Sequence, residues 1–251
     1  MSNKANQAVI LAAGAGSRLQ GLGDGEAISK PLVKIVGEEL ILRTLRTLNK
    51  AGINKFVIVL GYMADKVQAV MEEKCANLPL EIEFVFNPKW KGYANGLSLL
   101  VAEEKVEDKF LLSMCDHAFD ISIPTRLVAE DDESCDVKLC IDRKIDSVYD
   151  LDDATKVVTR DDKIIEIGKE LGEYNAVDCG LFLCRRTIFK ELHAINNEKG
   201  DCSLSDGMRR LGEKSRFGYL DIKDAMWQDA DTPETLEHAE KLMSEGIIRF
   251  P

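Results

Sequence analysis

The chain has 251 residues, of which 45% are hydrophobic and 31% charged, a balance typical of a globular protein with a sizeable core. Its net charge of −11 argues against a nucleic-acid surface, and no apolar run approaches the roughly 20 residues of a membrane span. The N-terminus lacks the apolar core of a secretion signal, and the seven cysteines include no Cys-x-x-Cys pair. We therefore expect a cytoplasmic protein with no membrane insertion and no nucleic-acid partner.

The first half of the sequence alternates between apolar strands and amphipathic helices. Continuous apolar runs predict strands at 8–13, 55–60, 81–86 and 109–116. Apolar residues at helical spacing predict helices at 41–48, 64–75 and 97–101. This rhythm is typical of a doubly wound α/β sheet whose strands are mostly parallel.

The second half is more irregular. It predicts strands at 137–142, 177–184 and 218–222, a hairpin at 155–167, helices at 187–195 and 203–214, a turn at 227–233 and a last helix from Pro233. No repeat or flexible linker divides the chain, so we expect one domain over residues 1–251.

The stretch that begins at Ala8 has the features of a phosphate-binding loop. The apolar run breaks into a loop with Gly14, Gly16, Ser17 and Arg18, and Lys30 follows after a further short loop. Glycines allow a phosphate to approach the backbone, and the two cations would hold its charge. Neither a dinucleotide fingerprint nor a P-loop fits the spacing. The alternative is an ordinary turn between a strand and a helix.

Two acids are candidates for a metal site. Asp116 and Asp229 each follow an apolar or aromatic stretch where a strand should end, and ligands gather at the carboxyl ends of parallel strands. Two carboxylates form an oxygen site that suits Mg²⁺, which bridges phosphates. Asp229 could instead belong to the start of the last helix, and helix capping is the favoured interpretation for Asp231.

Several further residues have a structural and a functional interpretation. Lys156 is either an outward-facing charge on a strand or a clamp for a second phosphate. Asp178 lies among apolar residues, where a carboxylate must be paired or bound to a ligand, for example to polyol hydroxyls. Asn95 and Ser98 could read a base edge or cap a helix, and His117 could contact a ligand or close a strand.

The loop at 11–19 with Lys30-Pro31-Leu32 resembles the signature of the sugar-phosphate nucleotidyltransferases, which have a Rossmann-like fold of the GT-A type. Later motifs resemble the CTP:inositol-1-phosphate cytidylyltransferases more narrowly, and the resemblance runs from about Ala8 to Glu240. These motifs are Ser113-Met-Cys-Asp-His117, Asp153-Ala-Thr-Lys-Val157, Glu166-Ile-Gly-Lys169, Asp178-Cys-Gly-Leu-Phe182, Ser203-Leu-Ser-Asp-Gly207 and Trp227-Gln-Asp-Ala-Asp-Thr-Pro-Glu234.

The resemblance implies an enzyme that transfers CMP from CTP to a phosphorylated alcohol, with inositol 1-phosphate first, and releases pyrophosphate. Arg18 and Lys30 would bind the triphosphate, Lys156 would orient the acceptor phosphate, and Asp178, with Glu166, would contact its hydroxyls. Asp116 and Asp229 would ligate Mg²⁺. The nucleotide would be held by Leu11, Ala12, Ala13, Gly14, Gly16, Ser17, Asn95, Gly96 and Ser98.

The sequence departs from this family in two respects. The loop from Gln20 to Ser29 is unusually glycine-rich and acidic for a segment near a triphosphate. Many relatives also carry a membrane-embedded alcohol-phosphotransferase domain after this one, so either such an enzyme is a separate downstream partner or this chain is a domain of a larger fusion protein. Other acceptors, namely a phosphonate, phosphocholine or a sugar phosphate, remain alternatives, as does a regulator that binds a nucleotide without turning it over.

Overall fold

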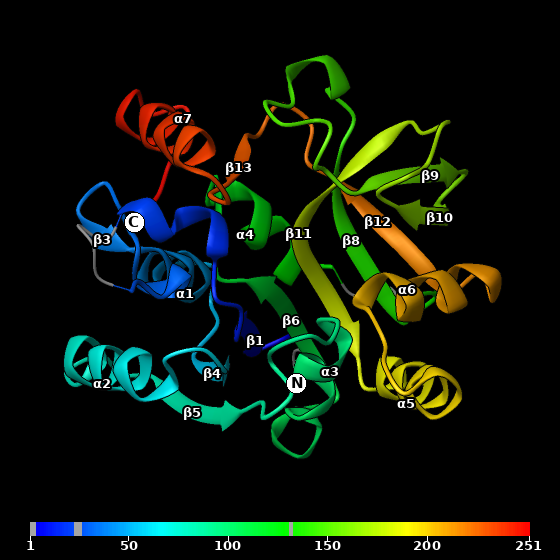
Figure 1. Cartoon of the computed structure of the whole chain (residues 1–251). Coiled ribbons are helices and arrows are strands. Elements are labelled where there is room, and N and C mark those ends of the chain that lie inside the picture. The colour runs from blue at the N-terminus through cyan, green and yellow to red at the C-terminus, as the bar shows by residue number, and fades with distance from the viewer. Residues whose placement is uncertain (1–3, 23–26, 131–132) are drawn as a thin grey trace.

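The computed structural model describes residues 4–22, 27–130 and 133–251. Its central element is a sheet of nine strands in the order β5-β4-β1-β6-β11-β8-β12-β10-β9, with strands contributed by both halves of the chain (Figure 1). Residues 23–26 of the acidic loop fall outside the described residues. Within the described ranges, no helix is long and apolar enough to cross a membrane.

The N-terminal half forms the parallel part of the sheet, as the apolar runs predict. Its strands are β1 (Gln7–Ala12), β4 (Lys55–Leu60), β5 (Glu81–Phe86) and β6 (Lys109–Met114). The helices between them are α1 (Leu40–Lys50), α2 (Ala64–Cys75) and α3 (Gly96–Leu100). β1 pairs in parallel with both β4 and β6, so the loops after β1 and β6 emerge side by side at the carboxyl ends of these strands.

The C-terminal half makes the sheet mixed. β11 (Ala176–Arg185) runs antiparallel between β6 and β8 (Val137–Asp142), and β12 (Phe217–Asp221) is parallel to β8. The expected hairpin is present as β9 (Lys156–Arg160) and β10 (Lys163–Gly168). The expected doubly wound α/β fold is confirmed, with β11 joining the two halves.

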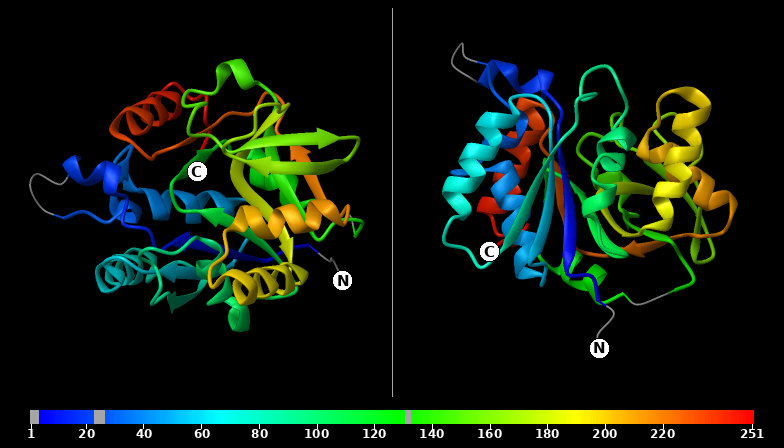
Figure 2. Two further views of the ribbon diagram at one scale, coloured as in Figure 1. Left: turned by 45° about the vertical axis from the view of Figure 1, so that its right-hand side comes forward. Right: turned by 90° about the horizontal axis from the view of Figure 1, so that it is seen from below.

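Helices cover both faces of the sheet (Figure 2). One apolar core contains the buried sides of α3, α5 (Thr187–Lys199) and α6 (Leu204–Glu213), and the other contains those of α1, α2 and α4 (Ser122–Val128). α6 begins at a capping box in which the Ser203 side chain accepts a hydrogen bond from the Asp206 N–H at 3.0 Å. The sheet is therefore held between two separate layers of helix.

A third cluster of buried apolar side chains lies apart from these two cores. It joins α7 (Pro233–Ser244) to β2 (Lys34–Ile35), β7 (His117–Phe119) and the 3₁₀ turn η1 (Ser17–Leu22). Its members are Leu19, Val33, Ile35, Leu40, Ala118, Ala230, Leu236, Ala239, Leu242, Met243 and Ile248. This cluster holds together several short segments near the carboxyl ends of β1 and β6.

Short elements account for most differences from the sequence prediction. The predicted turn at 227–233 begins instead with a strand, β13 (Trp227–Asp229), which pairs antiparallel with β7. β2 forms a similar two-residue ladder with β3 (Glu38–Glu39), and α4 was not predicted. The remaining 3₁₀ turns are η2 (Lys30–Leu32), η3 (Glu103–Lys105) and η4 (Ile145–Ser147). Such elements are too short to show a periodic pattern in sequence.

Candidate active site

The loop after β1 brings its backbone against Lys30. Gly16 has a φ of +61°, and a Cβ at this position would lie 2.4 Å from the Cβ of Lys30. Glycine is therefore required both for the backbone conformation and for the close approach. The Leu19 N–H donates to the Gly16 carbonyl at 3.0 Å, which opens the 3₁₀ turn that carries Arg18. The loop thus places Arg18 and Lys30 on one side of the site.

Lys30 forms the buried centre of the charge network. Its ammonium donates to the carboxylates of Asp116, just after β6, and Asp231, just after β13. Burial opposes the charge, but these two carboxylates raise the pKa of Lys30 above its ordinary value. Burial likewise opposes the charge of Asp116, and Lys30 and His117 nevertheless hold its pKa well below the usual range. Both groups are therefore charged at neutral pH.

His117 is held on three sides. Its Nδ1 lies 2.6 Å from Asp116 Oδ1, and its ring stacks on Trp227 with centroids 5.8 Å apart and planes inclined by 8°. Gly180, with a φ of +72°, contacts the ring so closely that a Cβ there would lie 2.4 Å from it. Burial lowers the pKa of His117, but nearby carboxylates, Asp116 foremost, raise it to about 9. The ring is therefore an imidazolium, and His117 both lies on a strand and lines the site.

Asp178 is placed by an irregularity in β11. The pairing of β11 with β8 shifts between Asp178 and Phe182, and Gly180 takes its left-handed conformation inside this bulge. The Asp178 carboxylate accepts the Gly180 N–H at 2.7 Å. Burial raises its pKa to about 6. A carboxyl group with this pKa can exchange hydrogen bonds with hydroxyl groups of a ligand.

Asp229 differs from Asp116 in its partners. Its Oδ1 accepts a hydrogen bond from the Gln228 side chain at 2.8 Å, and it has no salt bridge with the residues the structure describes. Burial raises the pKa of Asp229, and the negative charges of Asp231 and Asp116 raise it further. His117 opposes this shift, and Asp116 and Asp231 are already paired with Lys30, so Asp229 is the carboxylate of the three that is best placed to accept an added cation.

The described residues contain no group of three His, Cys, Asp or Glu side chains arranged to hold a metal by themselves. Mg²⁺ is commonly held by one or two carboxylates together with water and substrate phosphates. The carboxylates of Asp116 and Asp229 fit that requirement, since both line the same cavity.

Two adjoining cavities make up the site. The β1 cavity, of about 310 Å³, is lined by Leu11, Ala13, Gly14, Gly16, Ser17, Arg18, Lys30, Asn95, Ser98, Met114, Cys115, Asp116 and Asp231. The β11 cavity, of about 230 Å³, lies beside it and has polar and aromatic walls. Its side chains include Asp116, His117, Asp153, Lys169, Asp178, Phe182, Trp227, Asp229 and Asp231. Asn95, Met114, Asp116 and Asp231 line both cavities.

Most of the predicted site residues meet in these cavities. The β1 cavity collects nearly all of the residues expected to hold the nucleotide, and the β11 cavity collects Asp116, Asp178 and Asp229. Within the walls, the Asn95 side chain accepts the Leu204 N–H at 3.0 Å, and Ser98 Oγ accepts from the Asn87 side chain at 2.9 Å. These two residues thus have structural partners and still border the β1 cavity.

Four predicted residues line neither cavity: Ala12, Gly96, Lys156 and Glu166. Ala12, Lys156 and Glu166 directly neighbour Leu11, Thr155 and Ile167, which do line a cavity. Successive side chains along a strand point to opposite faces, so a residue next to a lining residue faces away from the cavity. Lys156 is buried, and its Nζ donates to the Asp152 carbonyl at 2.9 Å, whereas Glu166 is exposed. Gly96 instead packs tightly, because a Cβ there would lie 2.5 Å from the Cys202 carbonyl oxygen.

Asp231 and Lys169 are the main residues whose place in the site the sequence did not predict. The predicted capping role of Asp231 is wrong, because Thr232 is the N-cap of α7 and its side chain accepts the Thr235 N–H at 3.2 Å. Asp231 instead pairs with Lys30 and, at 2.9 Å, with Arg18. Lys169 follows the end of β10 and lines the β11 cavity. The sequence did contain a signal for Lys169, namely a lysine directly after the end of a predicted strand.

The chain is similar to known nucleotidyltransferases over most of its length. It is 35% identical over 97% of its residues to a bifunctional IPC transferase and DIPP synthase of Thermococcus kodakarensis, and 32% identical over 98% to the protein of that name from Archaeoglobus fulgidus. These matches cover 52% and 45% of the relatives, so the chain spans about half their length.

Among solved structures, the inositol-1-phosphate CTP transferase from T. maritima superposes with a TM-score of 0.83 at 27% identity, over 98% of this chain and 97% of that one. A family model described as the MobA-like NTP transferase domain matches residues 8–211. The loop after β1, Lys30, Asp116 and Asp178 fall within this match, whereas Asp229 and Asp231 lie beyond its end. The chain belongs to the family of MobA-like NTP transferase domains.

Proposed function

We propose that this protein is a cytidylyltransferase that transfers CMP from CTP to inositol 1-phosphate and releases pyrophosphate. The observation that carries the proposal is a pair of adjoining cavities that both have cationic side chains in their walls, Arg18 and Lys30 in one and Lys169 in the other. The similarity to the T. maritima inositol-1-phosphate CTP transferase supports the choice of nucleotide and acceptor.

The β1 cavity would hold the nucleotide. Its glycine loop leaves room for the ribose and phosphates, and Asn95 and Ser98 offer neutral groups to the base. Arg18 and Lys30 would bind the triphosphate and stabilise the departing pyrophosphate. Mg²⁺ held by Asp116 and Asp229 would offset negative charge on the phosphates.

The β11 cavity would hold the acceptor. We assign its phosphate to Lys169 and not to Lys156, because Lys169 lines the cavity and Lys156 donates to a backbone carbonyl elsewhere. Asp178 would exchange hydrogen bonds with the ring hydroxyls, and the imidazolium of His117 would add positive charge near the reacting phosphates. A phosphate monoester is largely a dianion at neutral pH, so no general base is needed for its attack on the α-phosphorus. The protein contributes placement and charge.

One observation favours a second candidate acceptor. Five carboxylates line the β11 cavity, from Asp116, Asp153, Asp178, Asp229 and Asp231. An acidic wall would also attract a cationic head group such as that of phosphocholine. Phosphocholine is therefore the alternative that the activity test must include.

The test is pyrophosphate release from CTP and Mg²⁺ with a panel of inositol 1-phosphate, phosphocholine, a phosphonate and glucose 1-phosphate. We expect turnover with inositol 1-phosphate. Faster turnover with phosphocholine would transfer the proposal to that acceptor, and no turnover with any acceptor or nucleotide would refute it.

A matched pair of lysine variants tests the acceptor site. Lys169→Gln should raise the KM for the acceptor phosphate by about tenfold or more, since a charge-assisted contact is removed. Lys156→Gln should leave this KM within about twofold of wild type, because its ammonium lies outside both cavities. The reverse result would return the acceptor phosphate to Lys156.

A further inference from the structure

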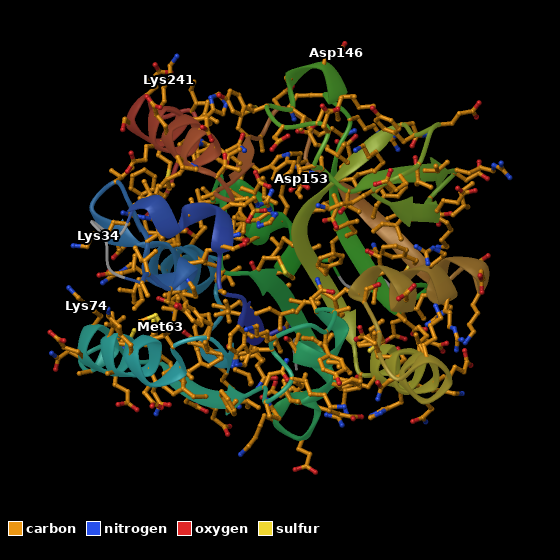
Figure 3. The ribbon with its side chains drawn as sticks, in the orientation of Figure 1. Lys34, Met63, Lys74, Asp146, Asp153 and Lys241 are labelled. Atoms are coloured by element: carbon orange, nitrogen blue, oxygen red, sulfur yellow. The ribbon has the colours of Figure 1, made fainter. Side chains whose placement is uncertain are left out.

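The carboxylate of Asp153 bridges the two sides of the site. It lies in the loop between η4 and β9, near the centre of the upper half of the molecule (Figure 3). Its Oδ2 accepts a hydrogen bond from Arg18 Nη1 at 3.0 Å, and its Oδ1 accepts from Lys169 Nζ at 2.5 Å. One carboxylate thus connects a cation of the β1 cavity to the cation of the β11 cavity.

Asp153 thereby occupies the positions that two substrate phosphates would need. Arg18 is the proposed partner of the triphosphate, and Lys169 is the proposed partner of the acceptor phosphate. The bridge is partly open to solvent, because the side chains of Arg18, Asp153 and Lys169 are 48%, 31% and 51% exposed. An exposed ion pair changes an equilibrium by at most about fivefold, so a phosphate can displace this carboxylate.

The two displacements are linked through electrostatic repulsion. A triphosphate that reaches Arg18 places several negative charges close to the Asp153 carboxylate. At about 4 Å, repulsion from even one of these charges in water is worth about fivefold in an equilibrium, and it is larger where solvent is partly excluded. Together, the several charges of a triphosphate therefore outweigh the roughly fivefold contribution of the remaining exposed ion pair with Lys169. Asp153 therefore leaves both cations, and the Lys169 ammonium becomes available to a second anion.

On the basis of the proposed function, we propose that Asp153 is a positioning residue that couples the occupancy of the two cavities. In the free protein, its carboxylate bridges Arg18 and Lys169 and competes with both phosphates. Binding of the donor removes it from Lys169, so the acceptor binds more tightly to the donor complex than to the free protein. The coupling acts through a single side chain and needs no movement of the sheet.

The test measures binding of inositol 1-phosphate by calorimetry, with and without a CTP analogue that carries a methylene between the α- and β-phosphates. The analogue cannot release pyrophosphate, so binding is separated from turnover. We compare the wild type with Asp153→Asn and with Asp152→Asn. Asp152 is the matched control, because it is exposed and its side chain forms no ion pair with the described residues.

We expect the analogue to lower the Kd for inositol 1-phosphate by about fivefold in the wild type and in Asp152→Asn, which is the most that an exposed ion pair contributes. In Asp153→Asn, the Kd should be the same within about twofold with and without the analogue. A loss of packing alone would not change the ratio of the two Kd values, measured without and with the analogue. Equal tightening in Asp153→Asn and Asp152→Asn would overturn the coupling while leaving the proposed function intact. No binding of the CTP analogue or of inositol 1-phosphate would overturn both.

A second measurement uses only the wild-type protein. The Lys169 ammonium should react faster with an amine-directed acylating reagent when the CTP analogue is bound, because Asp153 no longer holds it. Mass spectrometry of the labelled peptide gives this rate. Unchanged or slower labelling of Lys169 in the analogue complex would contradict the release of the bridge.

Discussion

Replacing Lys30 with methionine tests whether this lysine serves only the ligand or also the fold. The side chains of Lys30, Asp116 and Asp231 are 10%, 14% and 22% exposed. Removing one partner from a buried ion pair typically costs 3–5 kcal/mol, because the remaining charge stays buried without compensation. Since Asp231 is partly exposed and Asp116 keeps His117, we expect a loss of about 3 kcal/mol in the free energy of unfolding at pH 7.

Urea unfolding and thermal unfolding measure this loss. For a chain of this size, about 3 kcal/mol corresponds to a fall of roughly 6–12 °C in Tm. Lys34→Met is the matched control, because Lys34 is an exposed lysine on the neighbouring β2 (Figure 3). The control should change the free energy of unfolding by less than about 0.5 kcal/mol.

A double variant separates stability from catalysis. Lys30→Met combined with Asp231→Asn should recover about 1 kcal/mol of stability, because Asp231 without Lys30 keeps only the half-exposed Arg18 as a partner and its charge is then removed. Turnover should remain lower than wild type by about two or more orders of magnitude in both variants, since the cation that we propose to bind the triphosphate is still missing. A single variant as stable as wild type, or wild-type turnover in either protein, would refute the reasoning.

Two further substitutions test other parts of the structure. Gly180→Ala should lower kcat/KM by about tenfold, because the added Cβ displaces the His117 ring. Gly200→Ala is its control, since Gly200 has a similar φ of +75° but open space around it, and equal losses of activity would contradict the role of the ring. Asp120→Asn should cost about 2 kcal/mol of unfolding free energy at pH 7, because Asp120 accepts hydrogen bonds from Arg249. Burial opposes the charge of Asp120, but its hydrogen bonds, first of all that from Arg249, lower the pKa of its carboxyl group. The carboxylate therefore stabilises the folded protein above about pH 4, and this stabilisation is lost as the pH falls. In urea unfolding, the difference in the free energy of unfolding between wild type and this variant should therefore become smaller in acid. An equal difference at pH 7 and pH 3 would contradict the ion pair.

The β1 cavity could be predicted because its signals are local. β1, β4 and β6 are continuous apolar runs, and parallel strands bring the residues at their carboxyl ends together. Gly16 and Lys30 belong to one short stretch of chain. The apolar runs and the short loop therefore predicted the fold class, and they also predicted that the cavities lie at the carboxyl ends of the parallel strands.

The β11 cavity depends on pairing between distant parts of the chain, which short sequence patterns do not reveal. Whether Lys156 or Lys169 faces the cavity depends on the register of the β9–β10 hairpin, which shifts between Ile164 and Glu166. Asp231 precedes Thr-Pro-Glu, a good helix start, and its true role depends on cations about 200 residues earlier in the chain. Local sequence cannot distinguish a cap from an ion pair when the partner is so remote.

We expect the third apolar cluster to govern how the site responds to heat. It is separate from the two cores of the sheet, and it packs α7 against the segments next to Lys30, His117 and Asp231. Small clusters at the edge of a domain open at lower free energy than central strands, and they do so as a unit. Amide hydrogen exchange should therefore be faster in α7 than in β1 or β6. Activity would then decline with temperature before the sheet itself unfolds, and substitutions that enlarge this cluster would extend the working range without touching a charged residue.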